Sequence, residues 1–181
     1  DCMSIKLFEK LWGKRELSQK LNSTSCTGTA TVQDVQPGLP ELCRKAAAEG
    51  IVLLKNDGAL PVKKGQTVSI FGRVQKDYFY VGYGSGGDVN PPYRISLLQG
   101  LRENSGIQVN ESLAGVYEAW CDAHPIPEYA WGRWPRCYDE MKVDATLVKT
   151  AATYSDLALV VIGRAAGEDR ENLLEKGSYY L

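Results

Sequence analysis

Apolar and polar positions alternate along residues 40–181 in a way that predicts short buried strands between helices. Thr67–Phe71 and Leu157–Ile162 are runs of mostly β-branched and aliphatic residues, and a glycine follows each run. The second run is continuously apolar, which indicates a central strand buried on both faces of a sheet. A shorter strand is expected at Ile107–Val109.

Four segments have the spacing and the end signals of helices. Pro40 suits the first turn of one helix, and Gly50 suits its end. Ser96 and Gln99 form a capping-box pattern, in which each side chain satisfies a backbone donor of the first helical turn. Strands that alternate with helices predict the fold class, an α/β domain with a mostly parallel sheet flanked by helices. The expected helices are Pro40–Gly50, a helix that opens at Ser96, Leu113–Ala123, and Ala145–Tyr154 with Asp144 as its cap.

Residues 1–39 do not share this pattern. The stretch Asn22–Gly38 is rich in Ser, Thr, Gly and Gln and lacks periodicity, which is typical of a connector. We therefore expect two parts, with residues 1–39 as an N-terminal extension or connector and residues 40–181 as the α/β domain.

The balance of charge and the hydropathy of the chain argue against nucleic-acid and membrane partners. The 181 residues include 21 basic and 22 acidic side chains and no basic stripe, so a nucleic-acid partner is not expected. No apolar run approaches the roughly 20 residues needed to cross a bilayer, so no membrane partner is expected either. The chain begins at Asp1 without a charged and then apolar leader. We expect a cytoplasmic protein, with secretion as the alternative.

The scarcity of histidine and the spacing of cysteine limit the chemistry. His124 is the single histidine; it precedes Pro125 in a loop-like stretch and is expected at the surface. The five cysteines are irregularly spaced, which favours reduced thiols over a disulfide framework. Cys and His do not cluster at ligand spacing, so we expect no metal site and no cofactor. Because no G-x-S-x-G elbow accompanies the histidine, acid/base chemistry would have to use carboxylates or tyrosines.

Two loops follow the main strands, at the edge of the sheet where α/β folds bind ligands. The first, Tyr80–Tyr93, has four glycines within six positions, and its tyrosines suit the faces and hydroxyls of sugars. Its spacing is wrong for a dinucleotide-binding turn, because about ten residues separate the strand from Gly82 and two prolines precede the next helix. A plain surface loop is the alternative.

The second loop, Gly163–Asn172, holds three carboxylates and two arginines within eight residues. Arginines beside carboxylates pull the pKa values of the carboxyl groups apart, which acid/base chemistry can use. The alternative is a solvated, charged loop. Its position directly after a buried strand favours a functional role, because a rigid sheet holds loops at that edge.

At these positions the chain resembles the family 3 glycoside hydrolases. The resemblance implies a retaining, exo-acting glycosidase of the β-glucosidase type, in which a TIM-like barrel supplies an aspartate nucleophile. The α/β sandwich domain of that family supplies a glutamate acid/base. Three segments, in family order, are similar to this second domain: Ala47–Asn56 followed by Leu60-Pro61, Tyr83–Val89, and Leu159–Asn172.

The resemblance places the acid/base at Glu168. The segment Ala166–Arg170 departs from the commoner S-G-E-G-Y form, with Asp169 directly after Glu168, and this leaves Glu171 as the alternative. The substrate implied is a β-linked glycoside or oligosaccharide, and neither the sugar nor the linkage follows from these residues. The candidates for binding the sugar are Tyr83, Ser85, Asp88 and Arg170.

Nothing in the chain can be the barrel, because no eightfold β/α repeat is present and a barrel needs about 250 residues. The resemblance therefore implies an incomplete sandwich domain whose barrel partner belongs to the same polypeptide. In some family members the sandwich domain comes first, and with that order the missing strands and the barrel would follow Leu181. We expect no hydrolysis by this chain alone and an exposed apolar sheet edge that needs a partner, with a homo-oligomer as one possibility.

Two other functions stay open at this point. A domain with this fold can bind carbohydrate or act as a scaffold without catalysis, and a nucleotide-binding α/β domain is the third interpretation. Glu168→Gln in the complete protein would separate the first two functions. Titration with a nicotinamide cofactor would test the third.

Overall fold

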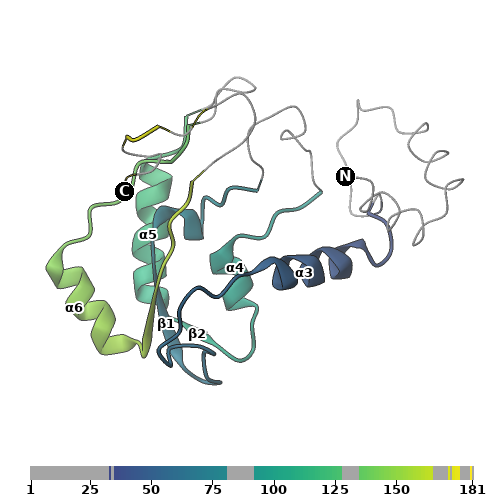
Figure 1. Ribbon diagram of the computed structural model, residues 1–181. Coiled ribbons are helices and arrows are strands. Elements are labelled where there is room, and N and C mark those ends of the chain that lie inside the picture. The colour runs from purple at the N-terminus through teal and green to yellow at the C-terminus, as the bar shows by residue number, and fades with distance from the viewer. Residues whose placement is uncertain are drawn as a thin grey trace, which may run out of the picture.

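A parallel β-sheet forms the centre of the protein (Figure 1). The computed structural model describes residues 33, 35–80, 92–127, 135–164, 171, 173–175 and 180. Within these ranges the sheet has three strands in the order β2-β1-β3. The strands are β1 (Thr67–Phe71), β2 (Gln108–Val109) and β3 (Leu157–Val160). Because β1 pairs in parallel with both neighbours, the prediction of a mostly parallel sheet is confirmed.

The described residues also form four α-helices and a short 3-10 turn, η2. The predicted helices agree with the observed ones to within about two residues, the usual uncertainty of helix ends. Side-chain caps explain where two of these helices begin. The Asn110 side chain accepts a hydrogen bond from the Leu113 amide, and the Asp144 side chain accepts one from the Leu147 amide. The elements are α3 (Leu39–Gly50), η2 (Arg73–Gln75), α4 (Leu97–Arg102), α5 (Glu111–Ala123) and α6 (Ala145–Tyr154).

The capping box expected at the start of α4 is only half formed. Ser96 Oγ accepts a hydrogen bond from the Gln99 amide at 3.2 Å, as predicted. The Gln99 side chain instead donates to Glu103 Oε1 at 2.9 Å, one turn further along the helix. The cap therefore satisfies one backbone donor through one side chain, because Gln99 finds a charged acceptor on its own helix.

Helices cover both faces of β1, as the fold class predicts. Val68 and Ile70 are buried on one face, in a cluster with Leu98 of α4. Phe71 lies on the opposite face, since successive strand residues alternate. There its ring meets Tyr117 of α5 edge to face, with 6.4 Å between ring centroids. The sheet thus has a core on each side, and its central strand is held in place from both.

A buried polar contact joins β1 to the start of α5. Asn110 Nδ2 donates to Ser69 Oγ at 2.9 Å, and both residues are buried. The other amide atom, Oδ1, accepts from the Leu113 amide at 3.3 Å. Asn110 therefore caps a helix and satisfies a buried hydroxyl with the same side chain.

The expectation that β3 is a central strand buried on both faces is wrong for the described sheet. β1 is the central strand, and β3 lies at the edge. Leu159 faces the core, whereas Val160 and Ile162 are 71% and 56% exposed. α6 packs on β1, and the side chains on the second face of β3 stay exposed among the described residues.

The first described helix stands apart from this core. α3 has no buried residue, and Figure 1 shows it reaching away from the sheet. The apolar run Ile51–Leu54 that follows it is exposed along its length. The turn signal after this run is confirmed, because Asn56 Oδ1 accepts from the amides of Gly58 and Leu60, each at 3.1 Å.

Candidate functional site

The carboxyl edge of the sheet is the candidate site, because both predicted functional loops leave from it. β1 leads toward the glycine-rich loop and β3 leads toward the charged loop, and the two strands are parallel neighbours. Ligands of α/β domains bind at this edge. The five predicted site residues themselves lie outside the described residues, and they stay predictions: Tyr83, Ser85, Asp88, Glu168 and Arg170.

Gly72, directly after β1, brings the two strand exits into contact. Its φ of +108° lies in a region that glycine adopts readily and other residues avoid. A Cβ atom at this position would lie 2.2 Å from the carbonyl oxygen of Val161. The Val161 amide also donates to the Phe71 carbonyl at 2.8 Å. The main chains therefore touch where they leave the sheet, with no room for a side chain between them.

Gly163 makes a second close contact at this edge. A Cβ atom there would lie 2.6 and 2.7 Å from the two methyl carbons of Val74 and 3.1 Å from the ring of Phe79. The Phe79 ring stacks on the ring of Tyr138, with 4.4 Å between centroids and 11° between planes. The exit of β3 is thereby packed against the residues that follow β1, and the Phe79 ring links them to the stretch that precedes α6.

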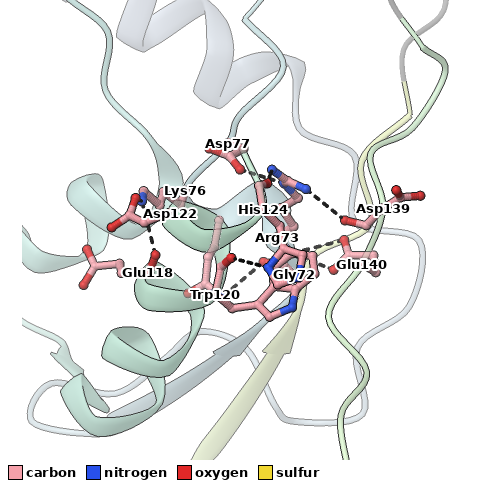
Figure 2. A network of polar contacts seen from close by, with 11 residues as sticks. Gly72, Arg73, Lys76, Asp77, Glu118, Trp120, Asp122, His124, Asp139 and Glu140 are labelled. Carbon is pink, nitrogen blue, oxygen red and sulfur yellow. Dashed lines mark hydrogen bonds and ion pairs between the residues drawn. The ribbon is translucent and has the colours of Figure 1, made fainter. Parts of the chain in front are cut away.

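Arg73 is a buried guanidinium at the centre of this edge. Its side chain is only 4% exposed. Nε donates to Asp77 Oδ2 at 2.7 Å, Nη2 to the His124 carbonyl at 2.5 Å and Nη1 to the Asp139 carbonyl at 3.3 Å (Figure 2). A buried charge requires such partners, and here they come from the turn itself, the end of α5 and the stretch before α6.

Aromatic rings complete the surroundings of Arg73. Its guanidinium carbon lies 5.2 Å from the centroid of the Trp120 ring and 5.7 Å from that of Tyr138. Cation–π attraction is strongest where water is excluded, as it is here. The Trp120 ring also stacks on His124, with 4.5 Å between centroids. His124 lies at the surface at the end of α5, as predicted, and its carbonyl accepts the hydrogen bond from Arg73 Nη2.

Glu140 places a carboxylate at the same edge. Both of its oxygens accept from the Arg73 amide, at 3.1 and 2.9 Å. The residue as a whole is exposed, but its carboxylate turns inward, and this desolvation raises the pKa of Glu140. The amide of Arg73 and the positive charges of Arg73 and Arg164 oppose that rise.

Lys76 ties the turn after β1 to α5. Its ammonium group pairs with the Asp122 carboxylate and donates to the Glu118 carbonyl at 3.4 Å. The hydrogen bond to Asp122 is the main reason that the pKa of Lys76 is raised. Figure 2 shows Lys76 and Arg73 reaching from the same turn to opposite sides.

Hydrogen bonds involve the described residues on either side of the charged segment 165–170, which is the middle of the predicted loop Gly163–Asn172. At its start, Arg164 Nη1 donates to the Gly163 carbonyl at 2.9 Å. At its end, Arg136 donates to the Glu171 carbonyl and pairs with Glu175, with 3.0 Å between Nη1 and Oε1. Glu171, the alternative acid/base, is exposed.

The described residues include free cysteines, but no metal-binding group and no membrane-spanning helix. Cys43, Cys121 and Cys137 are free thiols, and burial raises the pKa of Cys121 to about 11. No group of three or more His, Cys, Asp or Glu side chains in these ranges is placed to hold a metal ion. None of the helices described here is long and apolar enough to cross a membrane.

Sequence reasoning did not find the residues that organise this edge, namely Arg73, Arg136 and Glu140. Arg73 directly follows Gly72 after a buried strand, and this position is the one feature of the sequence that could have indicated its role at the sheet edge. Its partners His124 and Asp139 are 51 and 66 positions away, so no local pattern connects them.

A known protein family matches most of this chain. Residues 51–178 match the sequence profile of the glycosyl hydrolase family 3 C-terminal domain. The chain is 44% identical to a β-glucosidase of Ruminococcus albus over 146 residues, which are 78% of this chain and 15% of that enzyme. The chain thus spans a small part of the length of this curated relative.

Solved structures show the same fold. A β-glucosidase of Paenibacillus barengoltzii is 48% identical, with a TM-score of 0.77, and the match covers 81% of this chain and 16% of that one. β-Glucosidase 3B of Thermotoga neapolitana, solved with glycerol, is 33% identical with a TM-score of 0.69, and the match covers 81% of this chain and 21% of that one. These likenesses confirm the predicted α/β fold class.

Proposed function

The chain belongs to glycoside hydrolase family 3, and on that premise we propose that it supplies the acid/base glutamate, Glu168, of a retaining β-glycosidase. The observation that carries this proposal is the carboxyl edge of the sheet. There Gly72 and Val161 bring the exits of β1 and β3 into main-chain contact. The two segments that resemble the family's sugar-site loops follow these strand exits in the sequence, one after Tyr80 and the other after Arg164. Their shared origin at this edge is what supports the proposal.

The chemistry assigned to Glu168 has two steps. Its carboxylic acid first gives a proton to the oxygen that leaves the sugar, while a carboxylate from a barrel domain attacks the anomeric carbon. The resulting Glu168 carboxylate then takes a proton from a water molecule as the water oxygen bonds to the anomeric carbon, and the bond between that carbon and the barrel carboxylate breaks, which releases the sugar. Retention of configuration requires the two carboxyl groups to lie about 5–5.5 Å apart.

The substrate class follows from the relatives. The enzymes of Ruminococcus albus and Paenibacillus barengoltzii are named β-glucosidases, which makes a terminal β-linked glucose the first candidate sugar. The barrel belongs, in this proposal, to the same polypeptide, and the chain alone is inactive. A cytoplasmic location and a domain boundary near residue 40 are further parts of the proposal.

The test is Glu168→Gln in the complete polypeptide, with Glu171→Gln as the matched control. Glutamine keeps the size of the side chain but can neither donate the catalytic proton nor act as a base. Turnover of nitrophenyl β-glucoside should fall by orders of magnitude for Glu168→Gln and recover with azide, a nucleophile that needs no base. Glu171→Gln should keep normal turnover.

Two results contradict the proposal. Normal turnover by Glu168→Gln would favour the carbohydrate-binding or scaffold function. A loss confined to Glu171→Gln would move the acid/base role to that residue.

A further inference from the structure

The stretch 136–140 contacts the main chain directly after the charged segment 165–170, and it is linked through Phe79 to the main chain before that segment. On the side where the chain enters the loop, Gly163 packs on Phe79, and Phe79 stacks on Tyr138. On the side where the chain returns, Arg136 donates to the Glu171 carbonyl. Two segments 35 positions apart in the sequence are thus joined by one side chain.

The stretch 136–140 is itself fixed to the sheet. Arg73 donates to the Asp139 carbonyl, and its amide donates to both oxygens of Glu140. These contacts lie at the buried end of β1, where the guanidinium is enclosed by two aromatic rings. The stretch 136–140 therefore contacts both the turn after β1 and the main chain at Glu171.

Arg136 makes an ion pair with Glu175 and a hydrogen bond to the Glu171 carbonyl, and the two contacts differ in how much they restrain the main chain. The Arg136 side chain is 19% exposed, whereas that of its ion-pair partner Glu175 is 56% exposed, so solvent screens the pair and leaves it little stabilising effect. The bond to the Glu171 carbonyl joins a charged donor to the main chain. The second contact is the one that fixes where the loop ends.

We propose that Arg136 is a positioning residue for the glycosidase reaction, and that it acts by fixing the main chain at Glu171, three residues beyond Glu168. This inference rests on the proposed function of Glu168. A displacement of about 1 Å in a catalytic group can cost about a hundredfold in rate, so a tether this close to the acid matters for catalysis.

The experiment uses the complete polypeptide with Arg136→Met, and with Glu175→Gln as the matched control. Methionine removes both contacts of Arg136, whereas Glu175→Gln removes the ion pair and leaves the carbonyl bond in place. Arg136→Lys tests rescue, because lysine keeps a charged donor. Each variant is assayed on two β-glycosides of one sugar, with phenol and with 2,4-dinitrophenol as the leaving group.

The two leaving groups separate positioning of the acid from general damage. Phenolate leaves poorly and depends on the acid, whereas dinitrophenolate departs with little need of a proton. We expect Arg136→Met to lower kcat/KM about ten- to a hundredfold for the phenyl glycoside and less than threefold for the dinitrophenyl glycoside. Glu175→Gln should stay near wild type on both, and Arg136→Lys should recover part of the loss.

Three results would overturn the inference. These are unchanged kcat/KM for Arg136→Met, an equal loss on both glycosides together with a lowered melting temperature, and a loss in Glu175→Gln as large as in Arg136→Met. Glu168→Gln in the same assays distinguishes a failure of the role of Arg136 from a failure of the proposed function. If that variant loses activity and Arg136→Met does not, only the role of Arg136 fails; if Glu168→Gln stays active, the proposed function fails.

Discussion

Replacing Gly72 with alanine tests the contact between the exits of β1 and β3. Gly72 has φ +108° and ψ +131°, a combination that side-chain-bearing residues rarely adopt. The added methyl carbon would lie 2.2 Å from the Val161 carbonyl oxygen. That oxygen belongs to the main chain, so it cannot move without moving the β3 exit.

The two costs of this substitution can be added. Holding a residue with a side chain in such a backbone conformation costs about 1–3 kcal/mol. Overpacking of a well-filled site costs another 1–3 kcal/mol, roughly. The free energy of unfolding should therefore fall by about 2–6 kcal/mol, a large share of the roughly 5–15 kcal/mol that holds a typical domain folded.

Two other glycines separate the backbone cost from the steric cost. Gly65 has φ +85° but nothing within 4 Å of an added Cβ, so alanine there should cost only about 1–2 kcal/mol. Gly115 lies inside α5 with open space around it, so alanine there should stabilise the protein by about 0.5–1 kcal/mol. Urea unfolding followed by far-ultraviolet circular dichroism measures all three variants.

The expected order of urea midpoints is Gly115→Ala above wild type, then Gly65→Ala, then Gly72→Ala. A Gly72→Ala midpoint equal to that of Gly65→Ala would mean that only the backbone conformation matters. The strand exits would then not touch, and the structural basis for bringing the two loops together would be lost.

Two further predictions concern polar groups next to the sheet. Asn110→Ala should lower the free energy of unfolding by about 1–3 kcal/mol, because it removes a helix cap and leaves the buried Ser69 hydroxyl without its donor; an unchanged urea midpoint would contradict this. The pKa of Glu140 is raised above its usual 4.5, so the folded protein holds this proton more tightly than the unfolded chain does. The resulting stability is complete below roughly pH 4.5 and is lost as pH rises through the folded-state pKa. Urea midpoints measured from roughly pH 4 to pH 7 should therefore fall for wild type relative to Glu140→Gln, and a constant difference would refute the assignment.

Local signals predicted the elements well where the cause of each element is local. Thr67–Phe71 forms β1 with the predicted bounds, because a run of strand-forming residues followed by a glycine indicates both the strand and its end. Asp144 and Ser96 cap α6 and α4 as expected, since each cap depends on an amide three residues along the chain.

The predictions that failed concern contacts between distant segments. A continuous apolar run indicates burial but not which element covers each face, and among the described strands β3 lies at the edge of the sheet with Val160 exposed. In the same way, an arginine after a strand is usually at the surface, and only the distant carbonyls of His124 and Asp139 allow Arg73 to be buried. Glu168 and its neighbours were predicted from resemblance, and they remain to be tested by mutation.

The contact of main chains at Gly72 and Val161 has a consequence for protein engineering. The close approach at Gly72 and Val161 is made by backbone atoms, so it does not depend on which side chain stands at position 161. The glycine-rich and charged loops can therefore be treated as cassettes. On the proposed function, swapping them for those of a relative, with cuts placed beyond Phe79 and Arg164, should alter the substrate preference of the complete polypeptide without a redesign of the scaffold.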